Sequence, residues 1–350
     1  MNKNNLVGLS CDELIALAAR MGERPFRGKQ LYNQIYRRKV LDIGSMTDLS
    51  KDFRRRLGEE CAVGPLEVER RWQAADGTIK FLFRLDDGQR IESVYIPEEK
   101  RDTLCISSQV GCDVGCTFCL TAQMGFRRNL TPGEIVGQVL TCIHQGVLPE
   151  NGFNVVFMGM GEPLYNYRNV MKAFRLFTDQ DGMDLSRRKI TVSTAGVVPV
   201  MKKMLEEEQL PKLAVSLNST TEEMRSHIMP INRKWNMKEL LDACRKLARR
   251  NGQRVTFEYV LLAGETDREE DALRLIELLQ GMRAKVNLIP YNPNPGLPHR
   301  RPTQERVGDF QRLLVDNRIS AFVRRTRGDD VSAACGQLAH LKEAAVSAPS

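Results

Sequence analysis

The sequence has few histidines and no long apolar run, and these absences exclude several classes of protein. Only 4 histidines occur in 350 residues and none lies in a motif, so a histidine general base is not favoured. No run of about 18 apolar residues exists, so we expect no membrane span. The N-terminus also lacks the apolar region and cleavage site of a secretory signal. We therefore expect a cytoplasmic protein.

Acidic residues are outnumbered, and the 9 cysteines show no paired framework. In a chain this long, that cysteine pattern favours reduced thiols in the cytosol. The net charge of +8 favours a phosphate-rich partner such as nucleic acid. For any single basic cluster, a solvated surface remains the alternative interpretation. The clusters are Arg54–Arg56, Arg127–Arg128, Arg187–Lys189, Arg249–Arg250, Arg300–Arg301 and Arg324–Arg327.

Three cysteines stand close together as C-x-x-x-C-x-x-C, namely Cys112, Cys116 and Cys119. This spacing suits a [4Fe–4S] cluster in which one of the irons has no protein ligand. An open position lets a metal centre bind a substrate, as it does in catalytic zinc sites. We interpret that substrate as S-adenosylmethionine (SAM), chelated through its amino and carboxylate groups. One electron from the cluster would then release a 5′-deoxyadenosyl radical, which the protein must orient and shield.

A zinc loop, or three unrelated thiols, is the alternative interpretation of the motif. A zinc site usually brings a second C-x-x-C or paired histidines, but the nearest histidine, His144, is distant and alone. The small residues Gly111, Gly115 and Thr117 fit a loop around a bulky cluster. The iron–sulfur interpretation is therefore favoured.

Two accessory regions are expected ahead of the cysteine motif. Residues 1–62 predict a helical domain with a basic surface, which begins with a Ser10/Glu13 capping box and is our first choice for RNA contact. Residues 63–99 alternate in polarity and predict a short antiparallel β meander with Asp-Gly hairpin turns.

From residue 100 to 318 the pattern repeats strand, loop and helix, which predicts parallel strands with right-handed crossovers. Six such units predict an α/β fold with an open, partial (βα)6 barrel. Chemistry in such sheets lies at the carboxyl ends of the strands, where the cysteine loop is found. Residues 319–350 form a C-terminal extension, whose tail from 341 we expect to be disordered. The expected strands are 103–109, 153–158, 190–194, 213–218, 255–262, 286–291 and 319–325, and the expected helices 132–145, 168–178, 198–208, 221–228, 237–250 and 268–280.

Several polar residues follow the expected strands directly. Gly161 and Glu162 lie in a glycine-rich loop, where glycine lets the backbone approach a ligand and Glu162 can accept a hydrogen bond from an ammonium group. Ser193, Ser216 and Asn292 are candidates to bind the ribose or carboxylate of SAM. The alternative for each of these three is that it closes its own turn.

Two further cysteines have the character of reactive thiols. Cys335 lies among small residues after an acidic pair, which leaves its thiol accessible. Cys105 lies on the strand that leads into the cluster loop. The remaining four cysteines are interpreted as ordinary small apolar residues.

The motif resembles the radical-SAM superfamily, and longer strings narrow the resemblance. CISSQVGC, TAQMGFRRNL, MGMGEP, TVSTAGVVP, LAVSLN, MPIN, LIPYNPNPG and RGDDVSAACGQL look like the dual-specificity adenine-C2 methyltransferases of ribosomal and transfer RNA. The resemblance covers residues 21–338. It implies 23S rRNA and tRNA as substrates, a [4Fe–4S] cluster and SAM as cofactors, and an electron donor such as flavodoxin. It gives no oligomeric state, so we expect a monomer by default.

The resemblance also implies a two-stage reaction that uses both spare cysteines. One SAM methylates Cys335, and a radical from a second SAM takes a hydrogen from the S-methyl group. The resulting carbon radical adds to adenine C2, and Cys105 then attacks the sulfur of Cys335 in a transient disulfide that frees the product. Glu92 matches the family's proton acceptor. The matching SAM-binding positions are Gly161, Glu162, Ser193, Ser216, Leu217, Asn218 and Asn292.

Two departures and two alternatives accompany the resemblance. The family often has histidine where this chain has Asn218, which puts that side-chain contact in doubt, and serine or alanine where it has Leu120. Adenine-C8 methyltransferases of the antibiotic-resistance type share the cysteines but tend to lack a proline at position 163, so Pro163 favours C2. The alternative from another class is a non-catalytic iron–sulfur protein that binds RNA.

Overall fold

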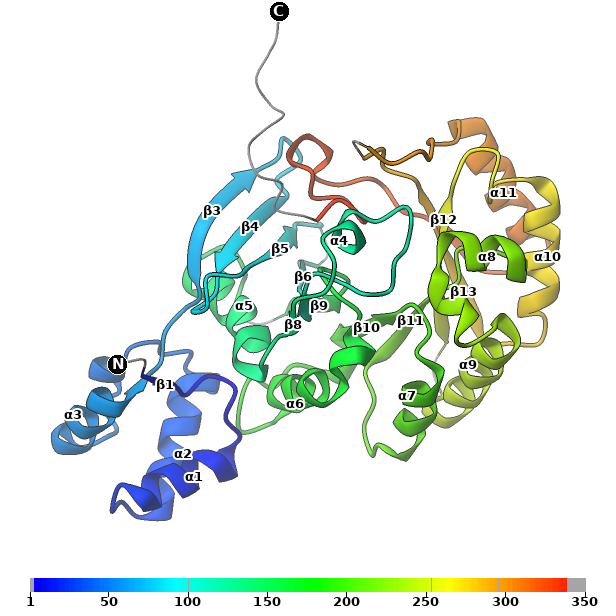
Figure 1. Ribbon diagram of the computed structural model, residues 1–350. Coiled ribbons are helices and arrows are strands. Elements are labelled where there is room, and N and C mark those ends of the chain that lie inside the picture. The colour runs from blue at the N-terminus through cyan, green and yellow to red at the C-terminus, as the bar shows by residue number, and fades with distance from the viewer. Residues whose placement is uncertain (1–2, 100, 151, 253, 295, 339–350) are drawn as a thin grey trace, which may run out of the picture.

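The computed structural model describes residues 3–99, 101–150, 152–252, 254–294 and 296–338, and its centre is one curved ten-stranded sheet (Figure 1). The strand order is β14-β13-β12-β11-β10-β9-β6-β5-β4-β3. Strands β6 to β14 in that order pair in parallel, whereas β3, β4 and β5 pair antiparallel and extend the same sheet. The bounds are β3 Glu67–Gln73, β4 Ile79–Arg84, β5 Arg90–Ile96, β6 Thr103–Cys105, β9 Asn154–Phe157, β10 Ile190–Thr194, β11 Lys212–Ser216, β12 Val255–Leu261, β13 Ala284–Pro290 and β14 Ala321–Val323.

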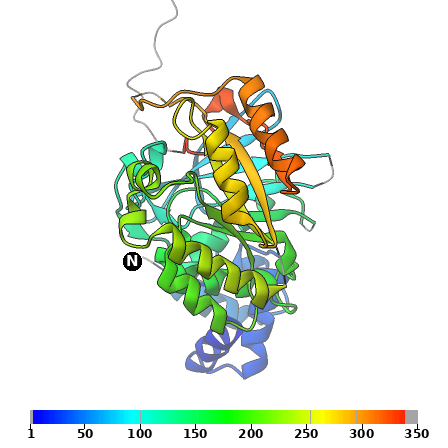
Figure 2. The same ribbon diagram turned by 90° about the vertical axis from the view of Figure 1, so that its right-hand side faces the viewer.

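Helices cover the outer face of the parallel strands, as the side view in Figure 2 shows for α10 and α11. The capping box of Thr131 and Glu134 starts α5, and Gly252 ends α9 in the left-handed conformation that glycine tolerates. None of the described helices is long and apolar enough to cross a membrane. The bounds are α5 Pro132–His144, α6 Tyr167–Thr178, α7 Val198–Lys203, α8 Glu222–Ile228, α9 Met237–Asn251, α10 Glu269–Leu279 and α11 Gln304–Asp316.

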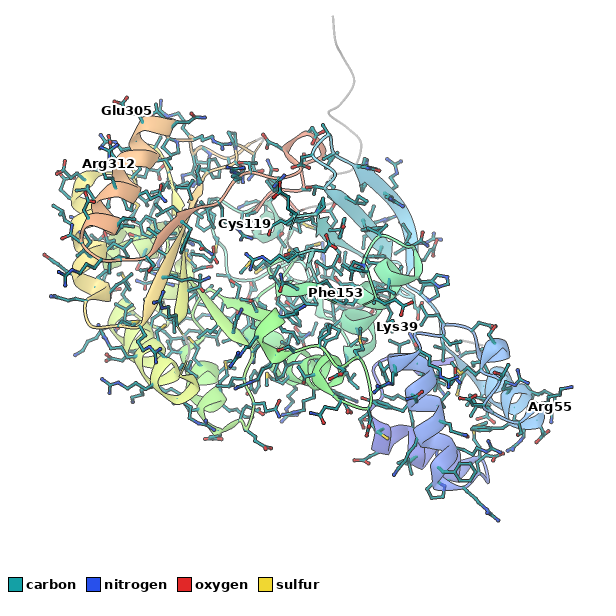
Figure 3. All side chains as sticks on the ribbon, turned by 180° about the vertical axis from the view of Figure 1, so that it is seen from behind. Lys39, Arg55, Cys119, Phe153, Glu305 and Arg312 are labelled. Atoms are coloured by element: carbon teal, nitrogen blue, oxygen red, sulfur yellow. The ribbon has the colours of Figure 1, made fainter. Side chains whose placement is uncertain are left out.

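The N-terminal helices form a separate lobe beside the sheet, with Arg55 at its far end in Figure 3. The predicted Ser10/Glu13 capping box is present at the start of α1. The hydroxyl of Tyr32 donates to Asp179 at 2.7 Å, and Lys172 pairs with Glu13 at 2.6 Å, so polar contacts join this lobe to the barrel. The elements are β1 Asn4–Asn5, α1 Cys11–Arg20, α2 Pro25–Tyr32, a π-helical turn Asn33–Arg37, α3 Lys51–Glu60 and β2 Cys61–Ala62.

The partial barrel expected from the sequence is confirmed, with three local differences. The expected strand 103–109 divides into β6 and a separate short β7, Gln109–Val110, which pairs with β8, Arg128–Asn129. The helices α4, Leu120–Gln123, and α11 were not expected. The predicted disorder from residue 341 lies outside the described residues.

Candidate active site

A cavity of about 950 Å³, including its open mouth, lies at the carboxyl ends of the parallel strands. Ten of the predicted site residues line it, and they come from six separate segments of the chain. Figure 3 shows one of them, Cys119, inside the curve of the sheet. The ten are Cys112, Cys116, Cys119, Gly161, Glu162, Ser193, Ser216, Asn218, Asn292 and Cys335.

The three cysteines of the motif lie close enough for their charges to interact. Burial raises the pKa of Cys112 to about 12 and that of Cys116 well above its ordinary value, and Cys119 adds to the rise in both cases. Burial thus disfavours the thiolate form of these cysteines, and the positive charge of bound iron would favour it. The described residues hold no group of three or more ligands arranged for a single metal ion. Three thiols from one loop at the wall of the cavity are the kind of donor set that an iron–sulfur cluster takes, with one cysteine on each of three irons.

A histidine braces the cluster loop from outside the motif. The Nδ1 of His299 lies 2.9 Å from Oε1 of Glu265, and its Nε2 lies 2.8 Å from Oγ1 of Thr117. A carboxylate only accepts, so Nδ1 carries the proton toward Glu265, and in the neutral ring Nε2 accepts from the threonine hydroxyl. The backbone N–H of Thr117 also donates to Ile228 at 3.0 Å. The loop between Cys116 and Cys119 is thereby tied to two other parts of the fold.

Glu162 is a buried carboxyl group that faces the cavity. Its Oε2 accepts from the N–H of Ala195 at 2.7 Å and its Oε1 from the N–H of Leu164 at 2.9 Å. Burial raises the pKa of Glu162 to about 7, although these backbone bonds act in the other direction. A buried carboxyl group whose pKa is raised to near 7 is stabilised when it pairs with a cation, such as an ammonium group.

The glycines before Glu162 serve the packing of the loop as well as the cavity. A Cβ on Gly161 would lie 2.4 Å from Cβ of Gln109, and one on Gly159 would lie 2.7 Å from the backbone of Ile106. Gly161 also has φ +98°, which other residues rarely adopt. Both glycines line the cavity. A larger residue would not fit at either position, because the residues after β9 pack closely against the segment after β6.

The last residue of β11 and the two residues after it are three of the predicted SAM-binding positions, and their side chains differ in whether they are free to bind a ligand. Ser216 lines the cavity. The side chain of Asn218 is committed to the protein, because its Oδ1 accepts from the N–H of Val260 at 2.9 Å. Leu217 is fully buried, its N–H donates to Glu258 at 3.0 Å, and its carbonyl accepts from Arg225 at 3.1 Å. Only Ser216 therefore offers a polar side chain without such an internal role.

The segment that carries Cys335 is docked on the cluster loop. The carbonyl of Gly336 accepts from the N–H of Leu120 at 2.9 Å, and that of Leu338 accepts from the hydroxyl of Thr121 at 2.6 Å. The side chain of Asn292 donates to the carbonyl of Cys335 at 3.4 Å. These bonds place the exposed thiol of Cys335 at the wall of the cavity.

Arg324, directly after β14, lies beside Cys335 and interacts electrostatically with Cys105. Its Nη1 lies 3.8 Å from Sγ of Cys335 and 3.9 Å from Oε2 of Glu258. The charges of Cys335, Glu258 and Cys105, in that order, raise the pKa of Arg324, against the effect of burial. Burial raises the pKa of Cys105 to about 12, and Cys335 adds to the rise while Arg324 opposes it. The two cysteines thus share one electrostatic environment, as free thiols.

Cys105 and Glu92 lie behind the cavity wall, outside the set of residues that line it. Glu92 on β5 is 1% exposed, and its Oε1 lies 3.5 Å from Nζ of Lys80. Lys80 also donates to the carbonyl of Ser332 at 3.3 Å, so it joins Glu92 to the segment that carries Cys335.

Sequence reasoning missed Glu258 and Arg324 as cavity residues. Glu258 is the one charged residue in β12, a strand in which every residue is buried, and this isolated charge was an available signal. Its Oε2 has no hydrogen-bond partner among the described residues, although Asn287 donates to its Oε1 at 2.9 Å. Arg324 gave no comparable signal, because it lies in a basic cluster that reads as surface.

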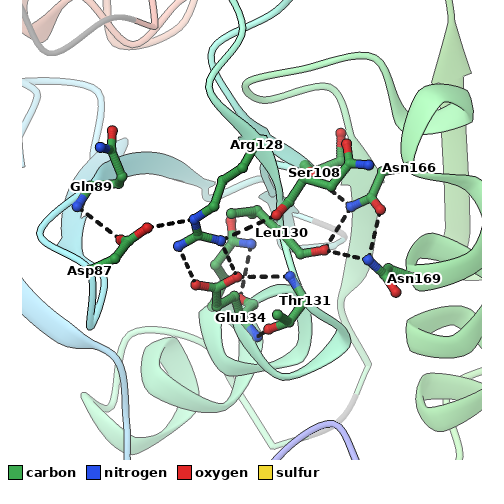
Figure 4. A network of polar contacts seen from close by, with 11 residues as sticks. Asp87, Gln89, Ser108, Arg128, Leu130, Thr131, Glu134, Asn166 and Asn169 are labelled. Atoms are coloured by element: carbon green, nitrogen blue, oxygen red, sulfur yellow. Dashed lines mark hydrogen bonds and ion pairs between the residues drawn. The ribbon is translucent and has the colours of Figure 1, made fainter.

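Arginines from two of the basic clusters form ion pairs with acidic residues of the same chain. Arg128 donates to Asp87 at 2.6 Å and to both oxygens of Glu134 at 2.9 and 2.7 Å, a network drawn in Figure 4. Arg55 and Arg56 likewise form ion pairs within the N-terminal lobe. These arginines are engaged in fixing the fold, which leaves fewer basic side chains available for phosphate groups.

The sequence and the fold of this chain are both similar to those of known protein families. Residues 106–276 match the family model of the radical SAM superfamily, and residues 4–63 match that of the ribosomal RNA large subunit methyltransferase N-terminal domain. A dual-specificity RNA methyltransferase RlmN from Anaeromyxobacter sp. (strain Fw109-5) is 50% identical over 341 residues, which cover 96% of this chain and 90% of the relative. A protein of the same name from Geobacter sulfurreducens is 48% identical, covering 95% and 91%. The crystal structure of a radical SAM methyltransferase from Sphaerobacter thermophilus superposes with a TM-score of 0.91 at 43% identity, covering 95% of this chain and 98% of that one.

Proposed function

The chain belongs to the RlmN family of radical SAM methyltransferases, and from this premise we propose that it methylates C2 of an adenosine in 23S rRNA and in tRNA. The observation that best supports a two-cysteine methyl transfer is the shared electrostatic environment of Cys335 and Cys105, because Arg324 acts on both and lies 3.8 Å from the sulfur of Cys335. The route needs a methyl carrier and a resolving thiol near each other, since one attacks the sulfur of the other.

The cofactors of this family are a [4Fe–4S] cluster and SAM, and the residues present fit both. Cys112, Cys116 and Cys119 would hold the cluster, since the positive charge of iron would offset the burial that raises the pKa of each thiol. When bound, the cluster supplies the electron that cleaves SAM. Glu162 would accept the SAM ammonium group, because its raised pKa marks a carboxylate without a cation. We assign Ser193, Ser216 and Asn292 to the remaining polar groups of SAM.

The chain's own groups account for the later steps. Cys335 carries the methyl group, and its accessible thiol at the cavity wall supports that role. Cys105 waits behind the wall as a protonated thiol, since burial raises its pKa to about 12. A proton must leave adenine C2 after the methyl group adds. Glu92 is our proposed acceptor, held through Lys80 against the segment of Cys335.

The adenine-C8 reaction is the competing function at the same site. Pro163 favours reaction at C2, because the C8 enzymes that the chain resembles tend to lack this proline. It lines the cavity directly after Glu162. We propose that the RNA binds first to the N-terminal domain, residues 1–62. The other domains that we propose are a meander at 63–99, a barrel core at 100–318 and a C-terminal extension at 319–350. An electron donor such as flavodoxin, a monomeric state and a cytoplasmic location complete the proposal.

The experiment uses the anaerobically purified full chain with SAM, a reductant and unmodified RNA. Mass analysis of the digested RNA against 2-methyladenosine and 8-methyladenosine standards should identify the product as 2-methyladenosine. Cys335→Ala should abolish methylation, and Cys105→Ala should leave RNA covalently attached to the protein. Cys142→Ala, on α5 and outside the set of residues that line the cavity, is the matched control and should behave as the wild type. Full activity of either active-site variant would overturn the two-cysteine route, and 8-methyladenosine would overturn C2.

A further inference from the structure

Arg225 on α8 is the largest of the fully buried side chains, at 1% exposure, and lies behind the cavity rather than in it. Its hydrogen-bond acceptors are four uncharged oxygens. Its Nη2 donates to Ala195 at 2.7 Å and to Ser216 at 3.1 Å, its Nε to Leu217 at 3.1 Å, and its Nη1 to Oδ1 of Asn232 at 2.7 Å. A buried guanidinium whose hydrogen-bond acceptors, within the described part of the chain, are all neutral oxygens requires an explanation, since burial of a charge is costly.

Three of these acceptors belong to the strand ends that form the SAM side of the cavity. Ala195 follows β10, and Ser216 and Leu217 stand at the end of β11. Ala195 uses both of its backbone groups, because its N–H donates to Glu162 at 2.7 Å while its carbonyl accepts from Arg225. One planar guanidinium therefore holds the ends of two adjacent strands and, through one peptide unit, the carboxyl of Glu162.

The helix that carries Arg225 is also joined to the cluster loop. The N–H of Thr117, next to Cys116, donates to the carbonyl of Ile228 at the end of α8 at 3.0 Å, and the N–H of Met229 donates to the carbonyl of Arg225 at 2.7 Å. Burial lowers the pKa of Arg225 to about 10. With a pKa near 10 the guanidinium remains charged at neutral pH. Its positive charge thus lies close to the cluster loop without touching the solvent.

We propose that Arg225 is a positioning residue that sets the SAM-binding ends of β10 and β11 and also supplies a fixed positive charge behind the cluster ligand Cys116. This proposal rests on the proposed function, since it concerns the same cofactors. Fixed positive charge near a cluster stabilises the more negative, reduced state and raises its midpoint potential. The two roles separate by substitution. Lysine keeps the charge but has no planar fork to reach three carbonyls, whereas methionine keeps the length and loses both.

The test measures the midpoint potential of the cluster and the equilibrium dissociation constant for SAM, in protein reconstituted with iron and sulfide. Arg225→Met should weaken SAM binding by about tenfold or more and shift the potential to more negative values. Arg225→Lys should weaken SAM binding but keep the potential close to the wild type. Arg233→Met, which removes an exposed arginine from the neighbouring turn Pro230–Arg233, is the control and should change neither.

Iron content and the thermal unfolding midpoint show which variants are folded and loaded. Wild-type affinity and potential in folded, loaded Arg225→Met would overturn the proposal. If that variant fails to fold, Arg225→Lys decides, because unchanged SAM affinity there would overturn the positioning role. A wild-type protein that holds a cluster but binds no SAM would instead contradict the proposed function. The two failures are therefore distinguishable.

Discussion

The Nη1 of Arg324 lies 3.8 Å from the Sγ of Cys335, and the same nitrogen lies 3.9 Å from the buried carboxylate of Glu258. The arginine thus stands between an acid from β12 and the proposed methyl carrier, and it also acts electrostatically on Cys105. Arg324 therefore contacts the carrier thiol itself, whereas the bonds of Gly336, Leu338 and Asn292 hold the backbone around it.

Replacing Arg324 by methionine should slow the methylation of Cys335 by roughly 10–100-fold, because a small misplacement of a nucleophile is enough for such a loss. The rate is measured by transfer of a labelled methyl group from SAM to the protein, with no RNA present. Arg325→Met, at the exposed neighbouring position, should retain the wild-type rate. Methylation of Arg324→Met at the wild-type rate would contradict the role of this arginine.

Glu162 should make the stability of the protein without cofactors depend on pH. Burial raises its pKa from 4.5 to about 7, so the folded chain holds one more proton than the unfolded chain between these values. Stability should therefore fall as the pH rises from about 4.5 to 7, by about 3 kcal/mol in total, and not change further above pH 7 on account of this group.

Denaturant unfolding of the wild type and Glu162→Gln at several pH values isolates this effect, since glutamine does not titrate. The wild type should lose stability relative to the variant as the pH rises from 5 to about 7. A difference between the two proteins that stays constant over this range would show that the carboxyl is not perturbed as described.

Thr117 should control how firmly the cluster loop holds iron, because its hydroxyl bonds to His299 at 2.8 Å. Thr117→Val keeps the shape of the side chain but removes the hydroxyl, and it should speed the loss of iron to a chelator by roughly tenfold. Thr117→Ser keeps the hydroxyl and should resemble the wild type. Equal rates of iron loss in Thr117→Val and Thr117→Ser would show that the bond to His299 does not hold the loop.

The elements that the sequence predicted best have strong local signals. The capping boxes at Ser10 and Thr131 are present, and the turn glycines Gly77 and Gly88 have the positive φ angles that their hairpins require. Helix α11 was missed even though Val307, Phe310 and Leu314 follow helical spacing after the cap Thr303. The prolines and arginines before it obscured a signal that the sequence did contain.

Only those cavity residues that belong to short sequence motifs could be predicted from the sequence. Each cysteine of the cluster loop belongs to one short string, so spacing alone identified it. The contact of Arg324 with Glu258 depends on the register of β14 on β13 and of β13 on β12, and no local pattern encodes it. The use of Arg225 as a buried brace was hidden for the same reason, because its partners lie on three other segments.

Asn218 should matter for stability as well as for the site, because it combines an unusual backbone conformation with a buried bond. Its φ of 58° is one that asparagine tolerates better than most residues, and its Oδ1 accepts from the N–H of Val260 at 2.9 Å. Asn218→Ala loses both advantages and should destabilise the fold by about 2–4 kcal/mol. Asn218→Gly relieves the backbone and should cost about 1 kcal/mol less, with the bond to Val260 still lost. Denaturant unfolding of both variants measures the difference, and equal destabilisation by alanine and glycine would show that backbone strain at position 218 plays no part.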